Sequence, residues 1–135
     1  KPKYWNKFDT GYVFNVDRQL ADWKFVIVCE GPFDAMSVDG VAVMSNQISE
    51  QQADIIDSLG REVIVVADRD EAGSKLLKDA QEYGWTASFP VWQETCKDIN
   101  EAVQKYGKLF VLKSIIDSKE TSKLKIEIMR KKMYN

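Results

Sequence analysis

Four short apolar runs divide the chain and predict the strands of one sheet. The first and third are almost entirely apolar and rich in β-branched residues, which is typical of strands buried on both faces. A further short strand is expected at 12–16, within an aromatic N-terminal segment. The four runs are FVIVC at 25–29, VAVM at 41–44, EVIVVA at 62–67 and TASFPV at 86–91.

Helical patterns follow each of these runs. Pro32 suits the first position of a helix, where its missing N–H costs nothing. Ser49 and Gln52 predict a capping box, and Gly60 ends the same helix. The predicted helices cover 32–38, 49–60, 72–84, 98–107 and 109–135, the last one broken near Ser118.

Strand and helix alternate four times, which predicts an α/β fold with about four mostly parallel strands flanked by helices. The 135 residues are enough for one domain with a sizeable core. We expect a lead-in over 1–24 that packs on the domain, the α/β domain over 25–107, and a C-terminal helical extension over 108–135. The chain begins Lys-Pro-Lys rather than with Met, so we expect a domain of a longer protein.

Composition narrows the chemistry. The chain has no histidine, and Cys29 and Cys96 lie far apart, which argues against a zinc site. Any catalysis must therefore rest on carboxylates, lysines or a bound metal. The net charge of −2 does not by itself indicate nucleic-acid binding. The two cysteines fit a reducing, cytoplasmic compartment. No apolar run approaches the ~20 residues of a membrane span, so we expect no membrane partner.

Acids at the strand ends are the candidate site. Glu30 directly follows the first apolar run, and Asp68 and Asp70 directly follow the third. Because the carboxyl ends of parallel strands meet at one sheet edge, where ligands bind, these three carboxylates are expected to converge. Their mutual repulsion favours a bound cation, and oxygen ligands without His or Cys suit Mg²⁺ or Mn²⁺.

Simpler roles for several of these residues stay open. Asp34, Asp70 and Glu71 stand near helix starts, where acids often act as caps or favourable dipole partners. A lone D-x-D also occurs in phosphatases, sugar transferases and receiver domains. The C-terminal run SKLKIEIMRKKMYN predicts a helix packed on the domain, or else a contact with a neighbouring domain, a helicase or nucleic acid.

Two motifs resemble the TOPRIM family, the metal-binding module of primases, type IA and type II topoisomerases and some nucleases. VIVCEGPFDAMSV is similar to the family's strand, Glu-Gly and downstream Asp, and VIVVADRDEAG to its strand, D-x-D and Ala-Gly. The runs DAMSV, ISEQQADII and CKDINEAVQKYG resemble the bacterial and bacteriophage primase branch. The resemblance covers roughly 25–107 and implies a TOPRIM (Rossmann-like) fold.

Carried over position by position, the resemblance implies an acidic site with Mg²⁺ or Mn²⁺ as cofactor. Glu30 would be a metal ligand or the general base, and Lys97 would touch phosphate or remain an ordinary solvated lysine. Asp34 would orient other groups, and Gly31 and Gly73 would be backbone turns. The implied acids are Glu30, Asp34, Asp68, Asp70 and Asp98, and the last three would hold metals that bind the phosphates of the incoming nucleotide.

The resemblance implies a nucleotidyltransferase that makes RNA primers from ribonucleoside triphosphates on single-stranded DNA during replication. The implied partners are a replicative helicase, as in a primosome, and the rest of the primase chain, because these residues include no zinc-binding module or basic subdomain. Asn46 and Pro32 depart from the usual primase residues without touching the acids. Alternatives are a TOPRIM nuclease or RNA-maturation enzyme, a TOPRIM binding module without chemistry, and a haloacid-dehalogenase-type phosphatase.

Overall fold

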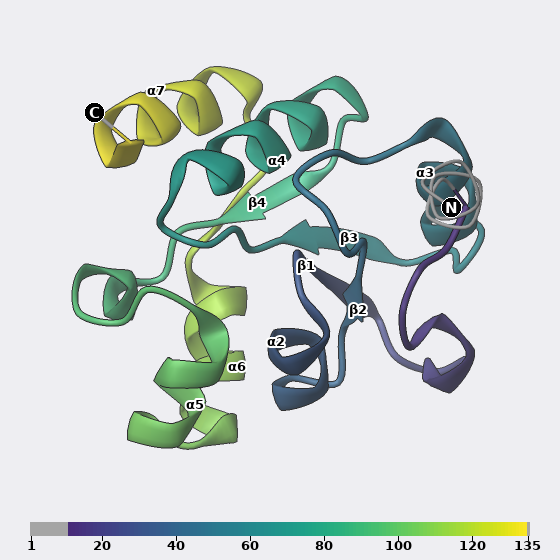
Figure 1. Ribbon diagram of the computed structural model, residues 1–135, viewed down its shortest axis with the longest axis horizontal. Helices are drawn as coiled ribbons and strands as arrows, with labels where there is room; N and C mark the ends of the chain where they lie inside the picture. The colour runs from purple at the N-terminus through teal and green to yellow at the C-terminus, as the bar shows by residue number, and fades with distance from the viewer. Residues whose placement is uncertain (1–10, 135) are drawn as a thin grey trace, which may run out of the picture.

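A five-stranded sheet with strand order β2-β1-β3-β4-β5 forms the centre of the structure (Figure 1). The structure is a computed structural model, and it describes residues 11–134 apart from the Glu71 side chain. β1 to β4 run parallel to their neighbours, whereas β5 is antiparallel to β4. The strands are β1 (Phe25–Cys29), β2 (Val41–Ala42), β3 (Glu62–Val65), β4 (Thr86–Ser88) and β5 (Lys119–Glu120).

Helices cover both faces of this sheet, so the predicted α/β fold is confirmed. α3, α4 and α7 contribute to the apolar cluster on one face, and α2, α5 and α6 to the cluster on the other (Figure 1). The bounds are α2 (Pro32–Ser37), α3 (Glu50–Asp57), α4 (Glu71–Glu82), α5 (Ile99–Tyr106), α6 (Lys108–Asp117) and α7 (Lys123–Tyr134), with 3-10 helices η1 (Val16–Arg18) and η2 (Val91–Glu94).

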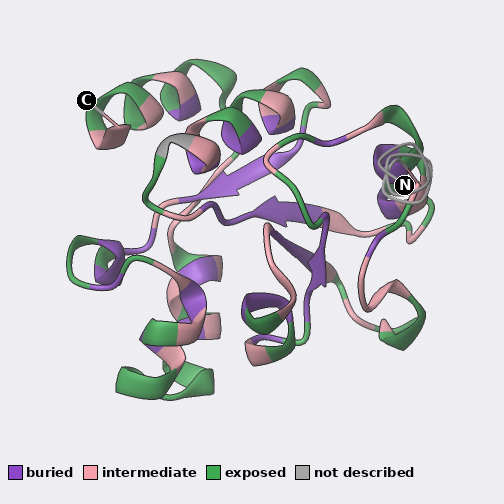
Figure 2. Cartoon of the chain, in the orientation of Figure 1, coloured by how far each residue is buried: buried purple, intermediate pink, exposed green. Residues whose placement is uncertain are grey.

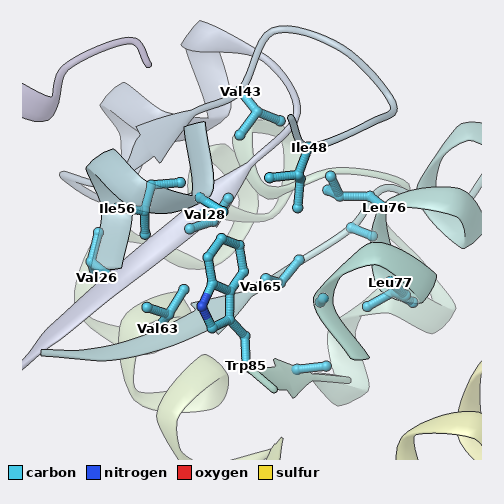
Figure 3. Packing of buried hydrophobic residues seen from close by; sticks show 14 of the residues in the cluster. Val26, Val28, Val43, Ile48, Ile56, Val63, Val65, Leu76, Leu77 and Trp85 are labelled. Carbon is cyan, nitrogen blue, oxygen red and sulfur yellow. The ribbon is translucent and has the colours of Figure 1, made fainter. Parts of the chain in front are cut away.

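The central strands are buried on both faces, as their continuous apolar runs predicted (Figure 2). Side chains alternate along β1: Val26 and Val28 pack into one cluster, and Ile27 and Cys29 into the other. Figure 3 shows the first cluster, in which β1 and β3 valines face apolar side chains of α3 and α4. This two-sided burial fixes the sheet, and with it the positions of the loops at its carboxyl edge.

The helix predictions agree closely with the structure. The capping box of α3 is present, with the Gln52 N–H donating to Ser49 Oγ at 3.1 Å and the Ser49 N–H donating to Gln52 Oε1 at 3.0 Å. β1 covers the predicted residues, whereas β2, β3 and β4 are shorter than predicted at their carboxyl ends. Met44 has a positive φ of 68°, which ends β2, and Pro90, which has no N–H, follows β4.

The fifth strand was not predicted. The break near Ser118 is confirmed, but the two residues after it pair with β4, with Lys119 opposite Ser88. The Lys119 ammonium also pairs with the Glu62 carboxylate at 2.9 Å and lies 4.8 Å from the centre of the Phe25 ring. Two polar residues give no period-two signal, so tertiary contacts select this strand.

The described part of the N-terminal segment contains less strand than predicted. Within 12–16 only Phe14 pairs, through an isolated antiparallel bridge to Ala42, and the chain then forms η1. Residues 1–10 of the predicted lead-in lie outside the described residues. Between residues 11 and 134 there is no helix with the length and apolar character needed to cross a membrane.

Candidate metal centre

Glu30, Asp68 and Asp70 lie together at the carboxyl edge of the sheet. Glu30 directly follows β1, and the two aspartates stand between β3 and α4; the sheet places Val28 of β1 opposite Val65 of β3. One carboxylate oxygen from each of the three lies within 4.8 Å of the others. Glu30 Oε2 also accepts a hydrogen bond from the Asp68 N–H at 3.0 Å, which ties the two loops together.

The electrostatics of this group favour a cation. Burial raises the pKa of Asp68 to about 8, and the charges of Glu30, Asp34, Asp70 and Asp98 act in the same direction. Burial also raises the pKa of Glu30, against the lowering effect of its hydrogen bond from the Asp68 backbone. A divalent cation bound here would offset the repulsion among these carboxylates and favour their ionised forms.

Asp34 borders the cluster and is almost fully buried, with 7% of its surface exposed. Its Oδ1 accepts the Asn100 N–H in the first turn of α5 at 2.8 Å, so it supports the start of another helix rather than capping its own. Burial raises the pKa of Asp34, while the bond from Asn100 and a side-chain hydrogen bond with Asp68 lower it. Asp34 therefore links α2, α5 and the acid group.

Two of the predicted ligands also cap helices. Asp70 is the N-cap of α4 and accepts the Gly73 N–H at 2.8 Å, and Asp98 is the N-cap of α5 and accepts the Glu101 N–H at 2.8 Å. For Asp70 the capping role exists beside membership of the acid group. Asp98 lies outside that group, although its charge raises the pKa of both Asp34 and Asp68.

The two predicted glycine turns differ. A Cβ on Gly73 would lie 2.0 Å from the Asp68 carbonyl oxygen and 2.8 Å from the Tyr134 hydroxyl, so only glycine fits there. Gly31 has an ordinary extended φ of −115° and open space around it. The close approach of α4 to the Asp68 carbonyl is thus what requires glycine at position 73.

Lys97 and Arg69 border a polar hollow beside the acids. The hollow has a volume of about 540 Å³, and Asp98 and Glu101 also line it. The Lys97 carbonyl accepts the Arg69 N–H at 3.2 Å, which connects the β3–α4 loop to the start of α5. Lys97 therefore lines the neighbouring hollow and is not part of the acid group, and its contact with phosphate stays a prediction.

Tyr134 is a residue of this site that the sequence did not reveal. Its hydroxyl donates to the Asp68 carbonyl at 2.5 Å, across 66 positions of sequence. No local motif marks such a contact. The prediction that the C-terminal helix packs on the domain was the nearest signal.

Comparison with known proteins identifies the family. The family described as Toprim-like matches residues 27–103, more than half of the chain. The chain is a member of the Toprim-like family. No curated protein sequence matches this Toprim chain.

Two solved structures resemble the Toprim chain. A crystal structure of the zinc-binding and RNA polymerase domains of the Aquifex aeolicus primase matches 83% of this chain and 31% of that chain, with a TM-score of 0.67 and 22% identity. The RNA polymerase domain of Mycobacterium tuberculosis primase DnaG matches 84% of this chain and 42% of that chain, with a TM-score of 0.67 and 18% identity. At these identities the likeness shows a shared fold. The Toprim chain thus spans less than half of either primase chain.

Replacing Asp68 by asparagine is expected to stabilise the metal-free domain. The raised pKa of Asp68 means that the folded state keeps a proton between about pH 4 and pH 8 that the unfolded state releases. This group therefore lowers the stability of the folded state as pH rises through that window. Melting temperatures in EDTA should show an advantage of Asp68→Asn over the wild type that grows from pH 5 to pH 8. If the advantage of Asp68→Asn instead became smaller as the pH rose, the raised pKa of Asp68 would be contradicted.

Proposed function

We propose that this Toprim domain is the metal-binding catalytic part of a DNA primase. Such an enzyme joins ribonucleoside triphosphates into RNA primers on a single-stranded DNA template during replication. The observation that carries the proposal is the convergence of Glu30, Asp68 and Asp70 within 4.8 Å. It occurs at the ligand-binding edge of a fold shared with primase RNA polymerase domains.

Asp68 and Asp70 would hold the cation, because both stand in the loop after β3 and lie close to Glu30, which follows the neighbouring strand β1. The Mg²⁺ or Mn²⁺ that these carboxylates would hold would supply positive charge toward the nucleotide phosphates and the leaving oxygen. Glu30 would complete the ligand set or accept the proton of the attacking hydroxyl, a role that its raised pKa suits. Asp98, which faces the adjoining hollow, would extend the ligand set toward a second cation.

The hollow beside the acids would receive the phosphates. Arg69 and Lys97 line its wall together with Asp98, and the Arg69 guanidinium also donates to the Gln93 carbonyl. Asn100, on the same wall, receives its support from the buried Asp34 carboxylate. Asp34 would therefore act by positioning the start of α5, and Lys97 by contact with phosphate or product.

The proposal includes the partners of a primase. A single-stranded template, ribonucleoside triphosphates, a replicative helicase and the remaining segments of a primase chain would meet this domain in a primosome. The setting would be the cytoplasm of a bacterial or bacteriophage-infected cell. This chain matches 31% and 42% of the two similar primase chains, so those primases contain further segments beyond the shared domain.

Primer synthesis is the test of this function. The full-length protein is incubated with single-stranded DNA, labelled ribonucleoside triphosphates and Mg²⁺ or Mn²⁺. We expect template-dependent RNA oligomers with the wild type and none with Glu30→Gln or Asp68→Asn. Cleavage of end-labelled DNA or RNA without incorporation would favour a nuclease or RNA-maturation enzyme instead. If the protein binds the metal but yields neither RNA oligomers nor cleaved strands, it is a binding module without chemistry.

A further inference from the structure

The last helix of the described chain ends at the acid group. α7 packs along α4, and its Ile126 is fully buried in the cluster that contains Leu76 and Leu77 (Figure 1). Nearer its end, Arg130 Nη1 donates to Ser74 Oγ in the first turn of α4 at 2.9 Å. The last contact is the hydrogen bond from the Tyr134 hydroxyl to the Asp68 carbonyl. Helix α7 thus follows α4 back to the loop that carries the acids.

The Asp68 carbonyl is held from two sides. Gly73 approaches it so closely that no Cβ fits, and the Tyr134 hydroxyl donates to it at 2.5 Å. These two contacts fix the backbone at Asp68, the first residue of the segment that carries the candidate ligands Asp68 and Asp70.

We propose that Tyr134 is a positioning residue that holds the Asp68–Asp70 loop ready for the metal and makes metal affinity depend on the docking of α7. The inference rests on the metal site of the proposed function. Without a cation, the side chains of Glu30, Asp68 and Asp70 repel one another when they ionise, which favours a wider loop. A restraint on the Asp68 backbone opposes that widening, so less of the binding free energy is spent on reordering the loop.

Mn²⁺ titration of matched tyrosine variants tests this role. Tyr134→Phe removes only the hydroxyl at the site. Tyr83→Phe removes the same kind of bond at the other end of α4, where the Tyr83 hydroxyl donates to the Ile48 carbonyl at 3.0 Å. We expect the dissociation constant for Mn²⁺, measured by calorimetry on the full-length protein, to rise about tenfold in Tyr134→Phe and less than about twofold in Tyr83→Phe. Melting temperatures in EDTA show whether both variants lose similar stability.

A second variant tests the same inference away from Asp68. Arg130→Met removes the bond to Ser74 and the ion pair with Glu127 at 2.7 Å, so it loosens the same end of α7. We expect it to weaken Mn²⁺ binding about threefold while the domain stays folded. If Tyr134→Phe binds Mn²⁺ as tightly as the wild type, the positioning role is overturned and the metal site is not. If Tyr134→Phe does not fold, the same result in Arg130→Met overturns that role. A wild type that binds no Mn²⁺ would overturn the proposed metal site and this inference with it.

Discussion

Mn²⁺ binding is expected to fall by two orders of magnitude or more when Asp68 and Asp70 are both replaced by asparagine, while the metal-free domain stays folded. The change removes two of the three negative charges in the acid group. An asparagine at position 70 would still accept the Gly73 N–H as the N-cap of α4, because asparagine caps helices as well as aspartate does. At position 68 the change removes a carboxylate whose pKa is raised by burial and by the neighbouring acids, so the neutral amide suits this environment better. Calorimetry gives the affinity, and thermal unfolding in EDTA gives the stability.

A charge-matched control separates a site from general electrostatics. Asp54→Asn with Glu82→Gln removes the same number of charges from exposed positions of α3 and the last turn of α4. This control should bind Mn²⁺ with an affinity within about twofold of that of the wild type, since solvent and salt largely screen exposed charges outside the acid group. Equal losses in the two double variants would mean that Mn²⁺ responds to net charge and not to the acid group.

Gly73→Ala is expected to damage both stability and metal binding. Its Cβ would lie 2.0 Å from the Asp68 carbonyl oxygen, so either α4 or the Asp68 loop must move. Backbone displacement of this kind costs roughly 2–4 kcal/mol, beyond the small helix-propensity gain of alanine. Because the carbonyl belongs to a candidate ligand residue, Mn²⁺ affinity should fall at least about tenfold. Chemical denaturation and calorimetry measure the two effects.

Gly31→Ala is the matched control, since Gly31 stands beside Glu30 in the other loop of the site. Its φ of −115° suits any residue, and nothing lies within 4 Å of the added methyl group. The expected cost is below about 1 kcal/mol, from replacing glycine at the N-cap of α2, with metal binding unchanged. If Gly73→Ala proved as mild as Gly31→Ala, the tight contact between α4 and Asp68 would be refuted.

The sequence predicted most of the fold, because that information is local and periodic. Apolar runs marked the four parallel strands, and the Ser49–Gln52 capping box marked the start of α3. The convergence of Glu30 with Asp68 and Asp70 followed from the general rule for parallel sheets, once the strand ends were placed. That inference did not require exact strand ends, since β3 ends at Val65 rather than at residue 67 as predicted.

Contacts between distant segments could not be predicted. β5 forms because Lys119 and Glu120 meet β4 in space, and two polar residues carry no strand pattern of their own. The bond from Asn100 to Asp34 and the bond from Tyr134 to Asp68 each join positions 66 residues apart. Asp34 was expected to cap its own helix or to orient other groups, but the sequence did not indicate that its partner is the Asn100 N–H in the first turn of α5.

Crystals soaked in Mn²⁺ and measured near the manganese absorption edge test the central claim most directly. An anomalous difference map locates the ion without assumptions about activity or partners. We predict its strongest peak between the carboxylates of Glu30, Asp68 and Asp70, and no such peak in Asp68→Asn/Asp70→Asn crystals. A fully soaked wild-type crystal with no peak among these three side chains, or with its strongest peak elsewhere, would contradict the account.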